Sequence, residues 1–197
     1  MRSLIPLLSL ALGMAAVPAG AAPNPVPHPA VFCEEEYALC IIAPCQPIPT
    51  AGGQIKNALC SCDVKKGWSM GPGSCASRRP VQKNGRTFLV STYSNLYNDQ
   101  NHLSSCSGSA QLWAWCYGAT CVVDPHDPAK AICNCPVKQS PAVVLGQCTS
   151  GICDQLWSAA TPAESGFANN HFYESMQKNH PGVPVNPPAT ACPPSGQ

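Results

Sequence analysis

Charged and aromatic side chains are scarce in this chain of 197 residues. Only 11% of the residues are Asp, Glu, Lys or Arg and only 7% are Phe, Trp or Tyr, whereas a typical globular domain has about 25% charged residues. The formal net charge is +1, and it falls to zero if the segment that contains Arg2 is removed. This balance offers no general electrostatic attraction to nucleic acid or to an anionic membrane.

Several motifs that would identify a cofactor or a catalytic site are also missing. No Cys-x2-Cys pair occurs, so neither a zinc ribbon nor covalently attached haem is indicated. His102, His171 and His180 are dispersed and lack the spacing of metal ligands. No convincing nucleophile, base and orienting group stand out as a catalytic trio. We therefore expect a protein that is not an enzyme, with no cofactor, no resident metal and no catalytic residue.

Cysteine, by contrast, is abundant. Twelve of the fourteen cysteines form two copies of one six-cysteine pattern, and the other two lie outside both copies. Both copies span the same length and share the spacings Cys-x4-Cys, Cys-x-Cys and Cys-x12-Cys. An even number of cysteines in an exported chain favours disulfides over free thiols. We expect all fourteen to be bridged, namely Cys33, Cys40, Cys45, Cys60, Cys62 and Cys75 in the first copy, Cys106, Cys116, Cys121, Cys133, Cys135 and Cys148 in the second, and Cys153 and Cys192 beyond it.

The repeat extends beyond the cysteines. Residues 58–65 read Ala-Leu-Cys-Ser-Cys-Asp-Val-Lys, and residues 131–138 read Ala-Ile-Cys-Asn-Cys-Pro-Val-Lys. Two copies at this level indicate an internal duplication. Matched cysteines at matched positions predict that each module closes its own bridges, and that Cys153 pairs with Cys192.

The N-terminus has the features of a secretory signal peptide. Arg2 supplies a positive charge, residues 4–17 form an apolar run, and Ala19-Gly20-Ala21 precedes the expected cleavage site. The run is shorter than the ~20 residues of a transmembrane span. We expect a protein secreted to the extracellular space or the periplasm, with no membrane span.

After export, the chain is rich in Pro, Gly, Ser and Cys and poor in large aliphatic residues. Such a composition predicts a thin core that disulfides must supplement. The expected segments are the signal peptide 1–21, a Pro-rich leader 22–32, cysteine module 1 at 33–75, a connector with a β-hairpin at 76–105, cysteine module 2 at 106–148 and a helical tail at 149–197 with a clip at Cys192.

Local signals predict the elements of the connector and of the tail. Asn84-Gly85 suits a type I′ turn between residues 81–83 and the β-favouring run 86–93. Thr161-Pro-Ala-Glu164 is a capping box with proline at the first helical position, which predicts a helix from Pro162 to about Lys178. The expected fold class is a small, disulfide-rich, mostly β or irregular protein, with two tandem cysteine modules of short hairpins and one C-terminal α-helix.

The first cysteine copy, with Gly67-Trp68 and Gly71 before its sixth cysteine, resembles an epidermal growth factor-like module. The second copy also looks like the N-terminal part of a follistatin-type module, through residues 116–121 and 131–135. The resemblance implies pairing of the first cysteine with the third, the second with the fourth and the fifth with the sixth. The implied bridges are Cys33–Cys45, Cys40–Cys60, Cys62–Cys75, Cys106–Cys121, Cys116–Cys133 and Cys135–Cys148.

Three further patterns carry a chemical and a structural interpretation. The Cys-x-Cys pairs could bind a soft metal through thiolates, or form disulfides. Residues 67–71, Gly-Trp-Ser-Met-Gly, match the nucleophile elbow of hydrolases, but we expect a turn because no alternating strands and helices surround them. Asp124-Pro-His-Asp-Pro128 could offer oxygen ligands to a cation, and is first of all a turn.

The clusters of charged residues and of tryptophans could likewise form a binding surface or have only a structural role. The basic residues of 65–86 could contact a polyanion or an acidic partner, or form a solvated face, and Glu34-Glu35-Glu36 is a small acidic run. Trp113, Trp115 and Trp157 could form an exposed aromatic strip or a small core, and the core is favoured in so aromatic-poor a chain.

These patterns favour a secreted or periplasmic, non-catalytic, disulfide-rich binding protein, of which an inhibitor is one form, with an extracellular or envelope protein (or glycan) as its partner. The expected binding surface comprises the loops around 46–58, 65–73 and 122–130. The alternative is an envelope protein that handles metals with reduced thiols. A small disulfide-stabilised hydrolase around Ser69 is a third and weaker hypothesis.

Overall fold

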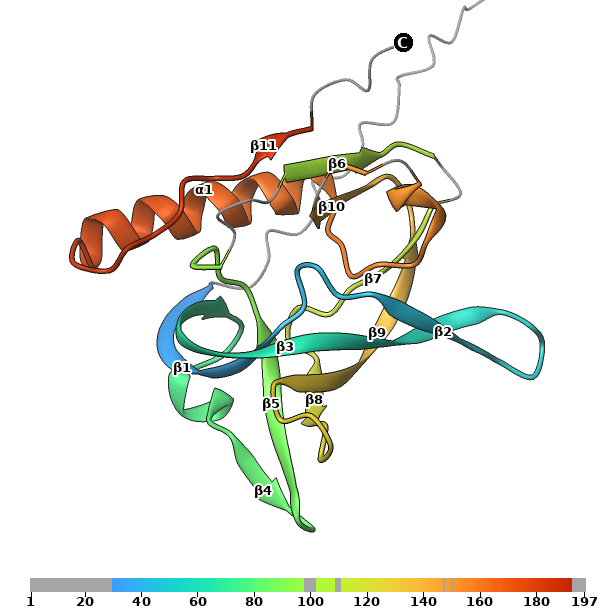
Figure 1. Ribbon diagram of the computed structural model, residues 1–197, viewed down its shortest axis with the longest axis horizontal. Helices are drawn as coiled ribbons and strands as arrows, with labels where there is room; N and C mark the ends of the chain where they lie inside the picture. The colour runs from blue at the N-terminus through green and yellow to red at the C-terminus, as the bar shows by residue number, and fades with distance from the viewer. Residues whose placement is uncertain (1–29, 98–101, 109–110, 147, 150, 193–197) are drawn as a thin grey trace, which may run out of the picture.

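The computed structural model describes residues 30–97, 102–108, 111–146, 148–149 and 151–192 (Figure 1). The predicted signal peptide and most of the predicted leader lie outside these residues. Val31 and Phe32, which the sequence assigned to the leader, already belong to the first strand, where they pair with Gly71 and Met70.

The structure confirms a small, disulfide-rich, mostly β protein, with one α-helix among the described residues. The elements are β1 (Val31–Leu39), β2 (Cys45–Pro49), β3 (Ile55–Gly71), the 3-10 helix η1 (Cys75–Arg78), β4 (Val81–Lys83), β5 (Arg86–Thr92), β6 (His102–Cys106), β7 (Leu112–Ala114), β8 (Thr120–Val123), β9 (Lys130–Gln139), β10 (Ala142–Gly146), the 3-10 helix η2 (Ile152–Asp154), α1 (Pro162–Asn179) and β11 (Thr190–Ala191).

Five strands close into a barrel in the order β3, β1, β5, β8, β9 and back to β3. All neighbours are antiparallel except β1 and β5, which are parallel. Closure depends on the length of β3, because residues 63–71 pair with β1 and residues 57–63 pair with β9. Strands from both cysteine modules and from the connector therefore share one sheet.

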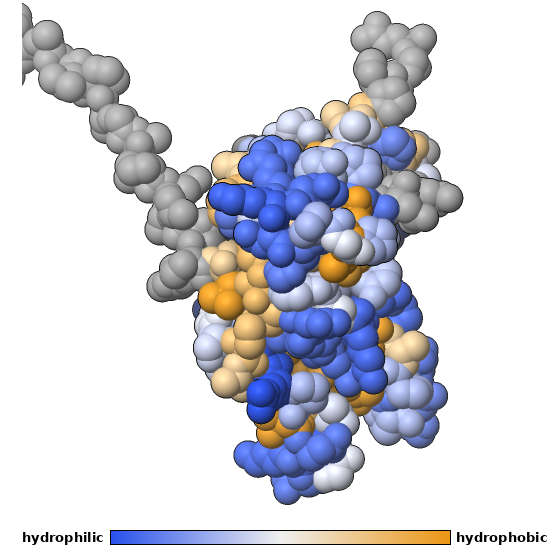
Figure 2. All heavy atoms as spheres, turned by 90° about the vertical axis from the view of Figure 1, so that its left-hand side faces the viewer, coloured by the Kyte–Doolittle hydropathy of each residue, from blue (hydrophilic) through white to orange (hydrophobic). Residues whose placement is uncertain are grey.

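The remaining elements extend this barrel or cover it. Strand β2 pairs with the first part of β3, β4 pairs with β5, and β7 pairs with β9. A separate sheet of β10, β6 and β11 lies beside α1 on one side of the barrel (Figure 1). Figure 2 shows a largely hydrophilic face on which hydrophobic residues form a narrow strip.

A row of four cysteines crosses the barrel wall. Cys45 lies opposite Cys60, Cys60 opposite Cys133, and Cys133 opposite Cys121. The outer pairs of this row, Cys45–Cys60 and Cys121–Cys133, are disulfides, and the Cα atoms of each pair are 4.1 Å apart. Two covalent bonds therefore join four neighbouring strands in pairs at one level of the barrel.

The two copies of the repeat meet at the centre of this row. Ala58 lies opposite Cys135, and Ala131 lies opposite Cys62. Since β3 and β9 are antiparallel, a two-fold rotation about a point between Cys60 and Cys133 exchanges the two Ala-x-Cys-x-Cys segments. Each alanine faces a bridged cysteine of the other copy, and its small side chain leaves room for that sulfur.

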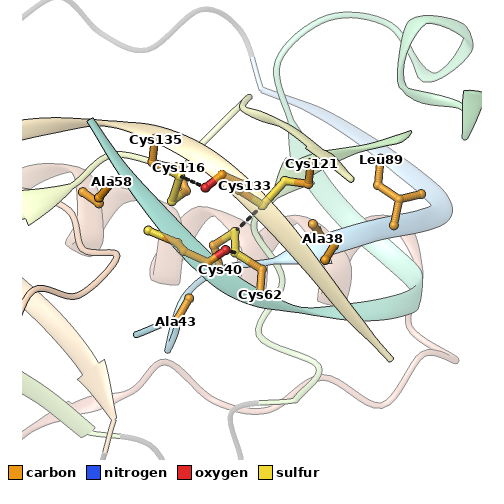
Figure 3. Packing of buried hydrophobic residues seen from close by; sticks show 13 residues of the cluster. Ala38, Cys40, Ala43, Ala58, Cys62, Leu89, Cys116, Cys121, Cys133 and Cys135 are labelled. Atoms are coloured by element: carbon orange, nitrogen blue, oxygen red, sulfur yellow. Dashed lines mark hydrogen bonds between the residues drawn. A yellow bond between two sulfur atoms is a disulfide. The ribbon is translucent and has the colours of Figure 1, made fainter. Parts of the chain in front are cut away.

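Sulfur and methyl groups fill most of the barrel interior (Figure 3). The buried cluster there consists of seven cysteines, five alanines and Leu89. The sulfur atoms of Cys40 and Cys133, which belong to different disulfides, are 3.4 Å apart. Disulfides thus occupy interior volume that branched aliphatic side chains would fill in a larger core.

All fourteen cysteines are bridged, as predicted, but all seven predicted pairs are wrong. In both copies the second cysteine pairs with the fifth and the third with the fourth. Cysteines two residues apart on one strand face the same side, so both members of each Cys-x-Cys pair point into the barrel and find partners in the same neighbouring segment. The bridges inside the barrel are Cys40–Cys62, Cys45–Cys60, Cys116–Cys135 and Cys121–Cys133.

The outer bridges differ between the copies. In module 1, Cys33 pairs with Cys75, so the prediction that a module closes its own bridges holds there. In module 2, Cys106 lies opposite Ala142 at one end of the β6–β10 pair, whereas Cys148 follows the other end. These two cysteines cannot meet, and the bridges are Cys106–Cys153 and Cys148–Cys192 in place of the predicted Cys135–Cys148 and Cys153–Cys192.

The turn and helix predictions are confirmed. Asn84 and Gly85 have φ angles of 51° and 70° between β4 and β5, as a type I′ turn requires. Helix α1 begins with the predicted capping box of Thr161 and Glu164. Its Phe172 is fully buried and packs outside the barrel in a second cluster with Met70 and Tyr93.

Candidate functional site

The β2–β3 hairpin, here called the arm, extends beyond the barrel at its tip (Figure 1), while residues 57–60 of its second strand also pair with β9. The Cys45–Cys60 disulfide closes its base. At its tip the amide of Thr50 donates to the carbonyl of Gln54 at 2.8 Å, and the amide of Gly53 donates to the carbonyl of Thr50 at 2.8 Å. The arm is held at both ends, so a partner would meet a preorganised surface.

The outer face of this arm carries two exposed aliphatic side chains. Ile48 is 37% exposed and Leu59 is 42% exposed. The register pairs Ile48 with Asn57 and Gln46 with Leu59, so all four side chains share one face. Pro47 and Pro49 of β2 lack the N–H groups that an added strand would need, so this arm offers side chains rather than a free strand edge.

The other two predicted binding loops have different outcomes. Within the predicted range 122–130, residues 124–129 connect β8 and β9, and residues 125–129 are exposed. There the Asp124 carboxylate accepts from the amide of His126 at 2.8 Å, and the Asp127 carboxylate accepts from the amide of Ala129 at 3.1 Å. These aspartates shape a turn, as predicted. Residues 65–73 are not a loop, because residues 65–71 continue β3 against β1.

The same correction applies to the sequence that resembles a nucleophile elbow. Ser69 lies within β3, fully buried, and its hydroxyl donates to Glu35 Oε1 at 2.5 Å. Strand geometry differs from the sharp strand-to-helix turn that exposes a hydrolase nucleophile. No histidine is among the hydrogen-bond partners of Ser69 in the part of the chain that the structure describes. The geometry at Ser69 thus gives no support to the hydrolase hypothesis.

The serine belongs to a buried polar group that sequence reasoning missed. Arg78 Nε lies 3.3 Å from Glu35 Oε1, and Arg78 Nη2 donates to the carbonyl of Val31 at 3.1 Å. Burial raises the pKa of the Glu35 carboxyl, although Ser69 and Arg78 act in the opposite direction, and burial lowers the pKa of Arg78. A signal was present in the sequence, since Glu35 alternates along the strand with Cys33 and Tyr37, which are both buried.

Ion pairs account for much of the predicted basic stretch. Besides the buried Arg78, Lys66 lies 3.7 Å from Glu36, and Lys65 lies 3.4 Å from Asp63. Asp63 also accepts from Lys130 at 2.6 Å across the β3–β9 pair. The structure therefore brings the acidic and basic runs together within the sheet, which weakens the case for a polyanion surface.

The tryptophans contribute mainly to packing. Trp113 is only 3% exposed, and its indole N–H donates to the Ser140 hydroxyl at 3.0 Å. Trp115 packs edge to face against Trp113, and Trp157 is half-buried. The core interpretation favoured by the sequence is confirmed for Trp113, while Trp115 extends from it towards a cavity.

That cavity lies between α1 and the barrel and has a volume of about 100 Å³. Its walls include Trp115 and Tyr117 after β7, Val143 and Leu145 of β10, and Phe167 and Ala168 of α1. The bridged cysteines Cys40 and Cys116 also line it, so the cavity adjoins the disulfide-filled interior.

Most polar side chains in the lining of this cavity bond to neighbouring protein groups. The Tyr93 hydroxyl donates to Asn169 Oδ1 at 2.8 Å, and Asn169 Nδ2 donates to the carbonyl of Ser165 at 3.0 Å. Burial raises the pKa of Tyr93, so its phenol stays neutral. Thr92 is a buried lining residue whose hydroxyl has no hydrogen-bond partner among the described residues.

The sulfur atoms come close enough to form metal-binding groups if they were reduced. Cys40, Cys62 and Cys116 form one such trio, with sulfur atoms all within 4.8 Å of one another. In the structure each of these sulfurs is part of a disulfide and so is not a thiolate ligand. A metal site here requires prior reduction of the barrel interior.

No family model, no curated protein and no solved structure matches the chain. The resemblance of the two cysteine modules to epidermal growth factor-like and follistatin-type modules therefore stays a prediction. None of the helices in the described ranges has the length and hydropathy needed to cross a membrane. The seven disulfides fit an extracellular or otherwise oxidising environment.

Proposed function

We propose that this protein is a non-catalytic binding protein of the extracellular space or the periplasm, and that the β2–β3 arm is its recognition surface for another protein. The observation that carries the proposal is the exposure of Ile48 and Leu59 on one face of a disulfide-closed hairpin. Apolar side chains on a rigid support lose little conformational entropy when a partner covers them.

The charge pattern supports a protein partner rather than a polyanion. Lys56 is the only charged residue between Cys45 and Cys60, and Gln46, Gln54 and Asn57 supply neutral hydrogen-bonding groups around the aliphatic pair. An apolar centre with a polar surround is the usual arrangement of a protein interface. An inhibitor-like action would be one form of this binding, with the arm held in the cleft of an extracellular protease.

A binding experiment with matched variants tests the proposal. Oxidised, biotin-labelled protein serves as the probe. Its saturable binding is measured to cell-surface proteins and to culture-medium proteins of the organism that produces it. The double substitution Ile48→Ser and Leu59→Ser should lower affinity at least tenfold. Val81→Ser, which removes a 55% exposed aliphatic side chain from the β4–β5 hairpin, is the control and should leave affinity unchanged.

Two results would contradict the proposal. Equal binding by the arm variant and the control would remove the arm from the recognition surface. Turnover of a substrate by the oxidised protein would replace a binding function with a catalytic one. The alternative metal-handling function has its own test, because a natively exported protein with free thiols and bound copper or zinc would support it.

A further inference from the structure

We propose that the cavity between α1 and the barrel is a binding site for a small apolar ligand, about the size of a single aromatic ring and without negative charge. This site is separate from the β2–β3 arm and does not depend on the function assigned to that arm. Its volume of about 100 Å³ is close to the range in which apolar protein cavities hold benzene.

The walls of the cavity are preformed. Cys40 and Cys116 are each fixed by a disulfide to the barrel, and the opposite wall is the first half of α1, whose start is held by the Thr161 capping box. Val143 and Ala160 are joined by backbone hydrogen bonds in both directions, at 2.8 and 3.3 Å. A wall braced in this way cannot relax to fill the space, so the cavity stays available to a ligand.

The chemistry of the lining selects the ligand. Trp115, Tyr117 and Phe167 offer aromatic surfaces, and Phe167, 42% exposed, lies where the cavity meets solvent. Aromatic and aliphatic walls favour an apolar ring through burial of its surface and through ring–ring contacts.

The charges around the cavity exclude an anion. Of the described residues that line it, Glu164 alone carries a formal charge, and none is Lys, Arg or His. The Glu164 carboxylate is already held by the amide and the hydroxyl of Thr161, at 3.0 and 2.7 Å. A ligand carboxylate would lose water and meet a second carboxylate, with no cation among the described lining residues, so fatty acids and aromatic acids should be rejected.

The test uses the oxidised full chain and three probes of similar size, namely toluene, benzyl alcohol and benzoate, with binding followed by NMR titration. Toluene and benzyl alcohol should bind saturably and give intermolecular NOEs to Ala168 and Trp115, and benzoate should bind at least tenfold more weakly. Ala168→Leu, which fills the cavity, should lower the association constants at least tenfold. Ala163→Leu, an exposed change on the same helix, should leave them unchanged.

The proposal is overturned if no neutral probe binds saturably, if benzoate binds as well as toluene, or if the NOEs arise at residues outside the cavity. The NOEs are measured on the unsubstituted protein, so they decide the outcome even if Ala168→Leu does not fold.

Discussion

The Arg78 guanidinium lies in the space that a β-carbon on Gly71 would occupy. Gly71 pairs with Val31 at the end of the β1–β3 ladder, and Arg78 crosses this point to reach the Val31 carbonyl and Glu35. Glycine is therefore required here for close approach of a buried side chain to the backbone.

Gly71→Ala should accordingly destabilise the protein, by about 1–3 kcal/mol as in other overpacked interiors. Urea unfolding of the oxidised protein measures the change in the free energy of unfolding. Gly52→Ala is the control, because a β-carbon there meets no atom within 4 Å. An equal effect at both positions would show that Arg78 does not depend on the glycine.

Ala58 and Ala131 should be similarly intolerant of larger side chains, because the two-fold relation places each opposite a bridged cysteine of the other copy. Ala58→Leu and Ala131→Leu are each expected to cost about 1–3 kcal/mol, since added methylenes would displace a buried disulfide. Asn134→Leu, an exposed change between the two cysteines of β9, is the control. A large difference between the two alanine variants would contradict the two-fold arrangement.

Disulfide mapping provides the next prediction. The oxidised protein should have a mass lower than that of its reduced form by fourteen hydrogens, and peptide mapping should recover Cys148–Cys192 rather than Cys153–Cys192. Recovery of Cys33–Cys45 or Cys62–Cys75 would instead support the pairing that the epidermal growth factor-like resemblance implies.

Disulfides inside the barrel should contribute more to the free energy of unfolding than disulfides outside it. Replacing Cys40 and Cys62 by serine removes a bridge from the barrel interior and leaves buried hydroxyls, so its cost should exceed the ~2–4 kcal/mol of a typical disulfide. Replacing Cys148 and Cys192 frees only the C-terminal segment beside β6. Chemical denaturation followed by Trp fluorescence compares the two, and an equal loss would count against a disulfide-filled core.

The lowered pKa of the Asp63 carboxyl predicts that the free energy of unfolding depends on pH. Burial alone would raise its pKa, but the hydrogen bond and charge of Lys130, together with Lys65, outweigh burial and lower it. A lowered carboxyl pKa in the folded state stabilises the protein above the unfolded pKa of 3.8, and this contribution disappears as the pH falls through the folded value. Because the carboxylate is 42% exposed, the contribution should stay below about 1 kcal/mol.

Asp63→Asn tests this contribution. The difference in unfolding free energy between the variant and the unsubstituted protein should be largest near neutral pH and should shrink as the solution is acidified. Lys130→Met should reproduce most of the loss, because it removes the main partner. A difference that grows on acidification would show that the sign is wrong.

The sequence was sufficient for elements whose signals are local. The capping box at Thr161 and the turn at Asn84-Gly85 depend on neighbouring residues, and both formed where the sequence predicted them. The repeated Ala-x-Cys-x-Cys also indicated a duplication, although its meaning, a pairing of the two copies across one sheet, required the register of β3 against β9.

Disulfide connectivity depends on that same non-local information. Cysteine spacing is shared by many scaffolds, and only the strand register shows that Cys60 faces Cys45 rather than Cys40. The cavity beside Trp115 was equally beyond prediction, because its walls come from seven separate segments of the chain. The burial of Glu35, by contrast, could have been predicted, since alternation along β1 places it on the same side as Cys33 and Tyr37.

A barrel filled with sulfur and methyl groups has a thermal consequence. The heat-capacity change of unfolding grows with the apolar surface that unfolding exposes, and half-cystines, alanines and one leucine expose little. The barrel should therefore add little curvature to the stability curve. The stability curve of this protein should consequently be flatter than that of a protein of its size with an aliphatic core.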